Sequence, residues 1–461
     1  MTERIIVHPF EDLRVENYTG LKQAGEHAYV KLSGMIPCEK REEYMELGYN
    51  QVWVYINALD EKEECILFYG VLSEFRLYVE NGICRLELLL RSGTSLMDLR
   101  KRIRSFQNTQ LTYGELLDSC KESYEYAARI MTVGKGQATG KFIMQYQETD
   151  WEFINRLASM NHTVVIADCS TKGSKFYFGL PDRKETITNI PSECRMECDM
   201  EEYRMKKESG IKVRPEDTVS CVWESRMVYR LGDWGFVNGR QMFVWKIQTY
   251  MKGSVLYHLY FMKPKNGFCV PLQYNEKISG VTLFGKVLDV KEEKVKLEIL
   301  EDENKARSGA CWFTYATVYS SSDMAGWYCM PEIGDRVRIC FPTENGQEAY
   351  VANAYHEADA AYRRKPECKS WRNREGKEIR LSPEEILLTN NAGTYIRLSD
   401  EKGIRIVSES SVSLQADGSL SIASRNASVE LSAPKKIKLK QGETEMRLGG
   451  DLQMRGSRIK L

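Results

Sequence analysis

The chain has few of the residues that carry out catalysis or hold metals. It contains five histidines in 461 residues, and none stands in a triad, a zinc motif or beside a glycine-rich phosphate loop. Cys194 and Cys198 lack a second Cys/His pair nearby, so we interpret them as ordinary thiols. Asp150 and Glu152 could be paired carboxylates, but they begin a predicted helix, where capping and the helix dipole favour acidic residues. The sequence therefore predicts no catalytic residue, no metal site, no cofactor and no enzymatic activity.

The composition excludes several classes of protein. The net charge is zero, from 65 basic and 65 acidic residues, which gives no electrostatic case for binding nucleic acid or a membrane surface. Residues 1–10 do not read as a signal peptide, and no apolar run approaches membrane-spanning length. The 13 cysteines are odd in number and lack a framework spacing. This pattern predicts a reducing cytoplasm and free, mostly buried thiols.

The C-terminal part lacks the residue types that are frequent elsewhere. No aromatic residue follows Tyr395, no cysteine follows Cys368 and no histidine follows His356, although 10% of the chain is aromatic. What remains is a repeat, in which two aliphatic residues separated by one other residue recur about every eight positions. The pairs are Ile379/Leu381, Ile386/Leu388, Ile396/Leu398, Ile404/Ile406, Val412/Leu414, Leu420/Ile422, Val429/Leu431, Ile437/Leu439, Met446/Leu448, Leu452/Met454 and Ile459/Leu461.

This alternation is typical of strands with one buried face, and turn residues fall between the pairs. Each repeat buries two aliphatic side chains, which contributes roughly 4 kcal/mol. Ordering eight residues costs roughly 8–16 kcal/mol in backbone entropy. One chain therefore cannot stabilise the repeat alone, and we predict a thin prism of several chains whose aliphatic side chains meet on a shared axis. The alternative is an ordinary antiparallel sheet domain.

The prism hypothesis assigns roles to particular residues. Arg405, Ser413 and Ser421 are expected to face water, and the lysines of 435–440 are interpreted as a solvated strand face. The residues expected at the axis are Ile396, Leu398, Ile404, Ile406, Val412, Leu414, Leu420, Ile422, Val429, Leu431, Ile437 and Leu439. The residues expected at the exposed end, where a tip protein would bind, are Leu452, Met454, Ile459 and Leu461.

The preceding segments are predicted to be mainly β. Strands are expected at 27–32, 51–57, 65–70, 83–90, 142–148 and 163–166, and again between 219 and 271. Three helices are expected from capping boxes: Ser95 with Asp98, Thr112 with Glu115, and Thr149 with Glu152. In the last of these, Trp151, Ile154 and Leu157 form the apolar face. Five strands at 281–290, 294–300, 311–319, 335–341 and 347–355 predict a small OB-type barrel.

Several motifs in this order resemble one family. The stretch QYQETDWEFINRL at 145–157 resembles the hub segment of VgrG spike proteins, and RSFQN at 104–108 with Thr112 and Tyr113 resembles the end of their first hub barrel. GWYCMPEIGDRV at 326–337 and AYVANAY at 349–355 are similar to their OB domain. The resemblance implies a first hub β-barrel at 1–110, a second hub domain at 111–275 with a helix at 150–160, an OB barrel at 276–356, a linker at 357–376 and a trimeric triple-stranded β-helix needle at 377–461.

By this resemblance the chain is a structural, homotrimeric spike of a contractile injection system, such as type VI secretion, an R-type tailocin or an extracellular phage-like particle. The implied partners are inner-tube and baseplate proteins and a PAAR-like tip protein, with no nucleic acid and only transient contact with a target-cell envelope. Assembly is expected in the cytoplasm, with export after release or firing. The chain departs from some relatives: the lysozyme insertion is missing, no effector domain is expected after Leu461, and no histidines stand near the tip. A carbohydrate-binding or carbohydrate-cleaving β-helix protein and a tail spike of a true phage virion remain open as alternatives.

Overall fold

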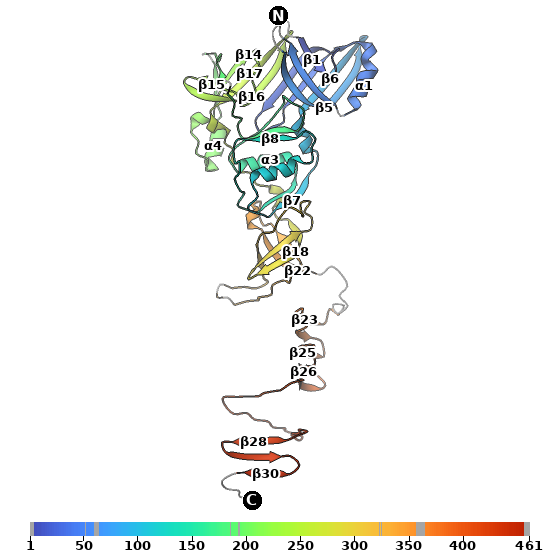
Figure 1. The fold of residues 1–461 in the computed structure, drawn as a ribbon, viewed down its shortest axis with the longest axis vertical. Coiled ribbons are helices and arrows are strands. Elements are labelled where there is room, and N and C mark those ends of the chain that lie inside the picture. Colours follow the sequence, from blue (N-terminus) through green and yellow to red (C-terminus); the bar gives the residue numbers. More distant parts are fainter. Residues whose placement is uncertain are drawn as a thin grey trace. The chain divides into compact units, whose positions relative to one another are not determined.

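The computed structural model describes residues 4–50, 52–59, 64–184, 186–191, 194–321, 323, 325–355 and 365–455. The chain divides into two compact units, Met1–His356 and Glu357–Leu461, and each is considered by itself. Strands dominate both units, so the predicted mainly β fold is confirmed (Figure 1). No helix in the described part of the chain is both long and apolar enough to cross a membrane.

A twelve-stranded sheet forms the upper part of the first unit (Figure 1). Its strands are β1 (Arg4–His8), β2 (Arg14–Gln23), β3 (Tyr29–Ile36), β4 (Trp53–Leu59), β5 (Glu64–Glu80), β6 (Ile83–Ser92), β12 (Thr186–Ile187), β13 (Arg195–Cys198), β14 (Val219–Ser225), β15 (Trp234–Val237), β16 (Arg240–Lys252) and β17 (Val255–Lys263). The main path runs β1-β4-β5-β6-β3-β2-β16-β17-β14-β13, and β15 pairs with both β12 and β16. Antiparallel pairing of β2 with β16 makes the sheet continuous across the boundary expected near residue 110.

The core of this sheet follows from alternation along its strands. In β6, Cys84, Leu86, Leu88 and Leu90 are buried, while the residues between them are partly exposed. The helices beside the sheet are α1 (Arg41–Tyr49) and α4 (Met200–Glu208). The short 3-10 helices of the unit are η1 (Cys38–Lys40), η2 (Gly93–Asp98), η3 (Pro215–Asp217), η4 (Lys265–Phe268), η5 (Glu276–Ile278) and η6 (Gly346–Glu348).

The prediction of an α-helix capped by Ser95 and Asp98 is wrong. Residues 93–98 form the 3-10 helix η2, which has no side-chain cap, and Leu99, which follows it, is 74% exposed. The carboxylate of Asp98 instead accepts hydrogen bonds from His27 Nε2 at 2.8 Å and Thr149 Oγ1 at 2.5 Å. The carboxylate of Asp98 is thus bonded to residues distant in the sequence, so it does not form the local capping box with Ser95.

The expectation that all thiols are free is also wrong. Cys38 and Cys84 form a disulfide, with their Cα atoms 5.5 Å apart. Antiparallel pairing of β3 with β6 places Ile36 opposite Cys84, which brings together two cysteines 46 residues apart. Of the remaining cysteines, Cys120, Cys169 and Cys221 are buried and the others are partly or fully exposed. Sequence spacing cannot reveal such a pair because strand pairing, not proximity in the chain, creates it.

A smaller layer lies beneath the large sheet and contains the motif at 145–157 (Figure 1). Its elements are β7 (Arg102–Phe106) paired with β9 (Ile143–Glu148), the sheet of β8 (Ala128–Met131), β10 (Val165–Ala167) and β11 (Lys175–Phe178), and the helices α2 (Tyr113–Lys121) and α3 (Asp150–Ser159). Both helices begin with the predicted capping boxes, Thr112 with Glu115 and Thr149 with Glu152. The predicted apolar face of α3 is confirmed, because Trp151, Ile154 and Leu157 are buried.

A closed five-stranded barrel ends the first unit. Its strands, in spatial order, are β18 (Thr282–Lys291), β19 (Lys294–Ile299), β20 (Phe313–Ala316), β22 (Tyr350–Tyr355) and β21 (Arg336–Cys340). Phe142 and Met144, from the layer above, belong to the hydrophobic core of the barrel. The barrel and the smaller layer therefore share one core.

The second unit contains two antiparallel meanders. The first has β23 (Lys369–Arg372), β24 (Glu378–Leu381), β25 (Glu385–Thr389), β26 (Tyr395–Ser399) and β27 (Gly403–Val407), paired in chain order. The second has β28 (Ile437–Gln441), β29 (Thr444–Leu448) and β30 (Leu452–Arg455). In the turns, Gly376, Gly393, Gly403 and Gly442 have positive φ, which an L side chain rarely adopts.

Candidate functional site: an apolar ladder and a buried ionic joint

The aliphatic pairs of the first meander form a ladder. The register places Leu381 opposite Ile386, Ile386 opposite Leu398, and Leu398 opposite Ile404. A second column of aliphatic residues runs beside the first, and its members are Ile379, Leu388, Ile396 and Ile406. Because directly opposed residues point to the same face of a sheet, all eight side chains lie on one face. We call this face the apolar ladder.

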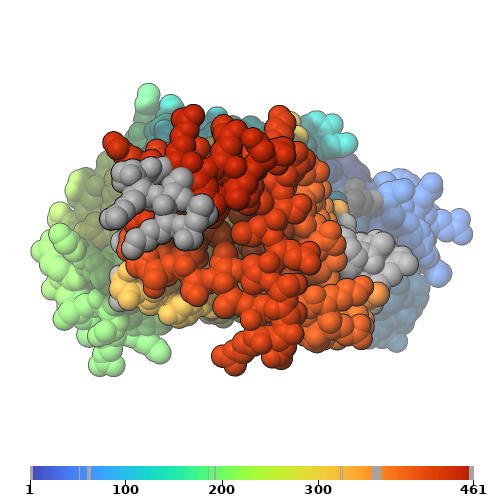
Figure 2. All heavy atoms as spheres, turned by 90° about the horizontal axis from the view of Figure 1, so that it is seen from below, coloured from blue at the N-terminus to red at the C-terminus, as the bar shows by residue number. Residues whose placement is uncertain are grey.

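The apolar ladder is uncovered within a single chain. The exposed fractions of its side chains run from 37% for Ile379 to 72% for Ile404. The residues of this unit are coloured orange to red in Figure 2. A contiguous apolar face of this kind is typical of a surface that another chain covers.

The opposite face of the same meander is polar. Arg380, Arg397 and Arg405 alternate with the aliphatic residues, and Glu385 forms ion pairs with Arg380 at 3.5 Å and with Arg397 at 3.1 Å. Leu387 is the buried exception on this side, at 6% exposed. The predicted orientation of Arg405 away from the aliphatic residues thus agrees with the register.

The segment between the meanders has no internal backbone pairing. It carries the predicted core residues Val412, Leu414, Leu420, Ile422, Val429 and Leu431, which are between 51% and 68% exposed. No strand is assigned in residues 408–436, and no backbone–backbone hydrogen bond joins 409–435 to another described residue. We call residues 409–435 the unpaired segment. Apart from the amides of Ser410 and Ala427 and the carbonyl of Ser411, which bond to nearby serine hydroxyls, its N–H and C=O groups are available to strands from elsewhere.

The second meander repeats the ladder near the C-terminus. Ile437 lies opposite Leu448, and Leu448 lies opposite Leu452; Leu439, Met446 and Met454 form the second column. On the other face, Lys438 forms an ion pair with Glu445 at 2.8 Å. Of the four residues expected to contact a tip protein, Leu452 and Met454 are 56% and 40% exposed. The other two, Ile459 and Leu461, lie outside the described residues.

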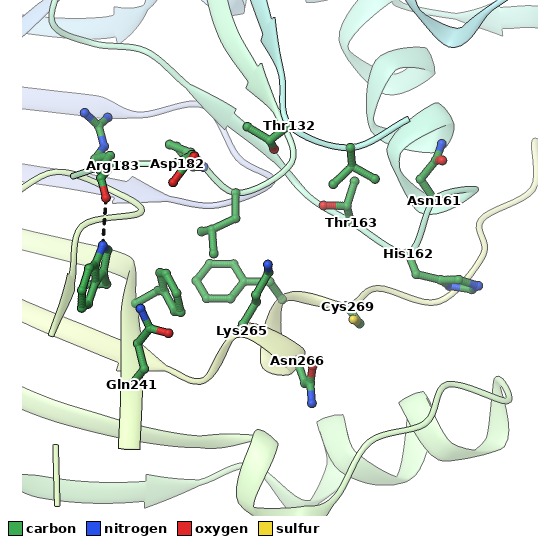
Figure 3. A pocket seen from close by; sticks show the side chains of 16 residues that line it. Thr132, Asn161, His162, Thr163, Asp182, Arg183, Gln241, Lys265, Asn266 and Cys269 are labelled. Carbon is green, nitrogen blue, oxygen red and sulfur yellow. Dashed lines mark hydrogen bonds between the residues drawn. The ribbon is translucent and has the colours of Figure 1, made fainter. Parts of the chain in front are cut away.

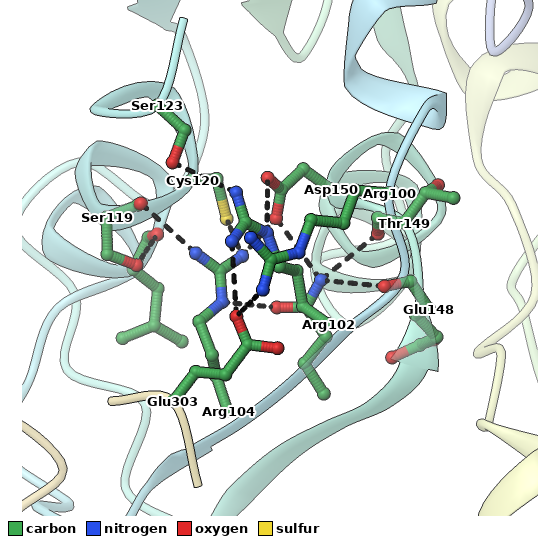
Figure 4. Close-up of polar contacts among 12 residues, drawn as sticks. Arg100, Arg102, Arg104, Ser119, Cys120, Ser123, Glu148, Thr149, Asp150 and Glu303 are labelled. Carbon is green, nitrogen blue, oxygen red and sulfur yellow. Dashed lines mark hydrogen bonds and ion pairs between the residues drawn. The ribbon is translucent and has the colours of Figure 1, made fainter. Parts of the chain in front are cut away.

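A second cluster of note is ionic and lies in the first unit (Figure 4). The guanidinium of Arg104, in β7, donates to Asp150 of α3, to Gln145 Oε1 at 2.8 Å and to the carbonyl of Ser119 at 3.2 Å. Asp150 is fully buried and also accepts a hydrogen bond from Tyr124 Oη at 2.8 Å. Burial, followed by the negative charge of Asp150, raises the pKa of Tyr124, so this hydroxyl stays a donor. We call this cluster, with the barrel contacts described next, the ionic joint.

The ionic joint continues into the barrel. Glu303, on the loop after β19, accepts hydrogen bonds from Arg100 at 3.0 Å and Arg102 at 3.1 Å. Its neighbour Asp302 is buried and accepts from the amide of Ser105 at 2.9 Å and from the hydroxyl of Ser105 at 2.6 Å. Charge-assisted bonds of this kind are the stronger class of hydrogen bond. The ionic joint therefore holds the barrel to the smaller layer in one orientation.

The ionic joint explains the motifs at 104–108 and 145–157. Arg104, Gln145 and Asp150 bond to one another, and Glu148 pairs with Arg156 at 2.7 Å. The interpretation of Asp150 and Glu152 as structural is supported, because Asp150 is bound to Arg104 and Glu152 closes the capping box of α3. Sequence reasoning missed the joint itself. Its only signal was the order of the motifs, since its partners are up to 203 residues apart.

A cavity of about 600 Å³ lies between the smaller layer and the large sheet (Figure 3). His162 and Asp182 lie on opposite sides of the view, and His162 Nδ1 is 3.1 Å from the carbonyl oxygen of Val270. Arg183 is paired with Asp233 at 3.2 Å. Cys269 also lines the cavity, and no hydrogen bond among the described residues joins its thiol to His162 or Asp182. Among the described residues, no group of three His, Cys, Asp or Glu side chains is arranged to hold a metal.

Comparisons with known proteins place this geometry in context. A profile of the phage tail baseplate hub (GPD) family matches residues 51–175. No curated protein matches the chain. The E. coli c3393 protein, described as a component of the type VI secretion system with structural similarity to the T4 bacteriophage tail proteins gp27 and gp5, is 12% identical; the match covers 76% of this chain and all of that one, with a TM-score of 0.53.

Two further similar structures contain VgrG. The lidless PdpA-VgrG complex matches at 8% identity over 86% of this chain and 94% of that one, with a TM-score of 0.56. The half-lidded Francisella PdpA-VgrG complex matches at 8% identity over 88% and 87%, with a TM-score of 0.54. At these identities the likeness establishes the fold.

Proposed function

We propose that this chain, whose fold is that of VgrG-type spike proteins, is the structural central spike of a contractile injection system and acts as a homotrimer. The observation that carries the trimer is the apolar ladder together with the unpaired segment. The baseplate-hub profile over residues 51–175 supports the attachment to a tail-like particle.

The apolar ladder and the unpaired segment need different contacts from neighbouring copies of the chain. The ladder needs an apolar surface opposite it, which a second and third ladder would supply. The unpaired segment needs hydrogen-bond partners along its backbone, because a strand with free edges is prone to wrong pairing. Three chains that wrap around one axis would meet both needs at once, since each contributes a face and all strand edges close.

The energetic gain is substantial. Covering the exposed half of one aliphatic side chain stabilises by roughly 1 kcal/mol. The twelve predicted axis residues would together contribute roughly 10 kcal/mol for each chain. Inter-chain backbone hydrogen bonds in the unpaired segment would add roughly 1 kcal/mol each.

The remaining parts follow from this arrangement. The segments 1–110 and 111–275 would form the hub that seats on the inner tube and baseplate, and 276–356 would be the OB barrel. Residues 357–376 would link this barrel to the needle at 377–461. Leu452, Met454, Ile459 and Leu461 would bind a PAAR-like tip protein. Assembly would take place in the cytoplasm, before the particle is exported or fired.

The role is structural rather than catalytic in this proposal. No hydrogen bond among the described residues joins His162, Asp182 and Cys269 of the cavity in Figure 3, and Asp150 and Glu152 serve the ionic joint and a helix cap. We expect peptidoglycan and polysaccharide cleavage assays on the purified protein to show no product. Cleavage that disappears when a single carboxylate is replaced would contradict this.

Native mass spectrometry of the purified full chain tests the oligomeric state. The expected mass is that of three chains, and hydrogen exchange is expected to show protected amides in the unpaired segment. A monomer with the same protected amides would contradict the proposal, because no partner within the chain accounts for such protection.

A tail spike of a true phage virion has the same fold and differs in genomic setting. Neighbouring genes for a sheath, a tube and an ATPase without capsid genes would favour the injection system. A carbohydrate-binding role would instead require aromatic platforms on the needle, and no aromatic residue follows Tyr395.

A further inference from the structure

Sulfur-bearing side chains alternate along the outer edge of the twelve-stranded sheet. Cys194, Met196, Cys198 and Met200 stand at every second position around β13, between charged residues. Alternate residues of a strand point to one face. Cys194 Sγ lies 3.7 Å from Met196 Sδ, and Cys198 Sγ lies 3.5 Å from Met200 Sδ. These thiols and thioethers are therefore close neighbours.

A third sulfur reaches the first pair from the adjacent strand. Met196 lies directly opposite Cys221 of β14, and Cys194 packs against the hydrophobic cluster that contains Cys221. Cys221 is fully buried, Cys194 is partly buried and Met196 is 50% exposed. The three residues thus range from the buried core to the solvent-exposed side of the strand.

The next sulfur along the row is already engaged. Met262 of β17 lies opposite Cys221, but its Sδ accepts a hydrogen bond from Trp223 Nε1 at 3.3 Å. The candidate donor set is therefore Cys194 Sγ, Cys221 Sγ and Met196 Sδ. We call these three residues the sulfur site.

The geometry points to the sulfur site as a binding site for a soft monovalent metal ion, Cu(I), held by two thiolates and one thioether. Thiolate and thioether donors select Cu(I) over harder ions, which prefer oxygen or imidazole ligands. Zn²⁺ favours four donors of Cys, His or carboxylate type, and the described residues place no group of three such side chains together.

The spacing suits one ion. Metal–sulfur bonds of about 2.3 Å in a trigonal plane set the sulfur atoms about 4 Å apart. The 3.7 Å between Cys194 Sγ and Met196 Sδ is close to that value, so these two donors need little rearrangement to share an ion. Each thiol that becomes a ligand releases its proton to water, and the copper keeps its oxidation state. Because each thiol must lose its proton to bind the ion, affinity increases with pH as the competing proton becomes scarcer.

A competition titration tests this site on the full chain. The reduced protein is titrated with Cu(I) under anaerobic conditions against the chromophoric chelator bicinchoninate. We expect one tightly held equivalent per chain. Cys194→Ser should weaken the affinity by at least about 100-fold and Met196→Leu by about tenfold, because each removes a direct ligand, which matters at least as much as losing an outer-shell partner.

Cys329→Ser is the matched control, since Cys329 is an exposed thiol in the barrel, and it should leave the affinity unchanged. X-ray absorption of the loaded protein should show sulfur neighbours only. Equal affinities for the wild type and Cys194→Ser, or complete loss of copper to the chelator, would overturn the inference. So would a Cys194–Cys221 disulfide that forms in air equally fast with and without Cu(I). None of these measurements depends on trimer formation or on the spike role.

Discussion

Replacing Leu414 by aspartate is the sharpest test of the trimer core. Leu414 lies in the unpaired segment and is 67% exposed in the single chain. In the proposed trimer its three copies meet at the axis, so the substitution places three carboxylates in one apolar position. Ser413→Asp is the matched control, because in the proposed strand its side chain would point to the opposite, solvated side.

The expected loss can be worked out from separate contributions. Removing Leu414 forfeits roughly 1–2 kcal/mol of apolar burial for each chain. Desolvation of each carboxylate costs several kcal/mol after relaxation. Two charges about 6 Å apart repel by about 3 kcal/mol at an effective dielectric constant near 20. The total exceeds what one repeat contributes, so the needle should fray around this position or the trimer should fail to form.

Light scattering and hydrogen exchange give the readouts. Leu414→Asp should shift the measured mass towards that of a single chain, or speed the hydrogen exchange of the amides of 409–435. Ser413→Asp should keep the mass of three chains and the protection of these amides. Burial and mutual repulsion should raise the pKa of the introduced carboxylates in the trimer. Assembly of Leu414→Asp should therefore recover as the pH is lowered through that raised value, and Leu414→Asn should be milder and insensitive to pH.

Equal tolerance of Leu414→Asp and Ser413→Asp would refute the assignment of faces. A trimer that keeps protected amides with Leu414→Asp at neutral pH would refute the shared axis itself.

Three further predictions concern the hub and the tip. Burial lowers the pKa of His258, 4% exposed with Nδ1 2.8 Å from Thr249 Oγ1, to about 4, so the unfolded chain takes up its proton first as the pH falls. The free energy of unfolding should fall by up to about 3 kcal/mol between pH 6.5 and 4, and His258→Gln should flatten this dependence in urea titrations. Asp150→Asn should destabilise the hub by about 3–5 kcal/mol, because it leaves Arg104 buried without its carboxylate, whereas the exposed Asp182→Asn should change stability by less than about 0.5 kcal/mol. Deleting residues 452–461 should release a small tip protein from isolated particles while the trimer stays intact; particles that retain it in equal amount would contradict the predicted contact.

Local rules succeeded where a single segment decides its own structure. The capping boxes at Thr112 and Thr149 and the buried face of α3 follow from residues within one helix. They failed at Ser95, because Asp98 is bound by His27 and Thr149 from distant parts of the chain. The same physical reason applies to the disulfide of Cys38 with Cys84, which depends on the pairing of β3 with β6.

The sequence by itself determined the repeat: a period near eight and strict alternation leave the aliphatic residues on one face, whatever covers that face. It also contained the motif order that resembles VgrG. Only the tertiary structure decided that the large sheet runs through the pairing of β2 with β16, and that Arg104 and Asp150, with Asp302 and Glu303, join the hub to the barrel. Periodicity is a property of neighbouring residues and can be read along the chain. Strand partners and buried ion pairs depend on which distant segments meet, and that is settled by the packing of the whole fold.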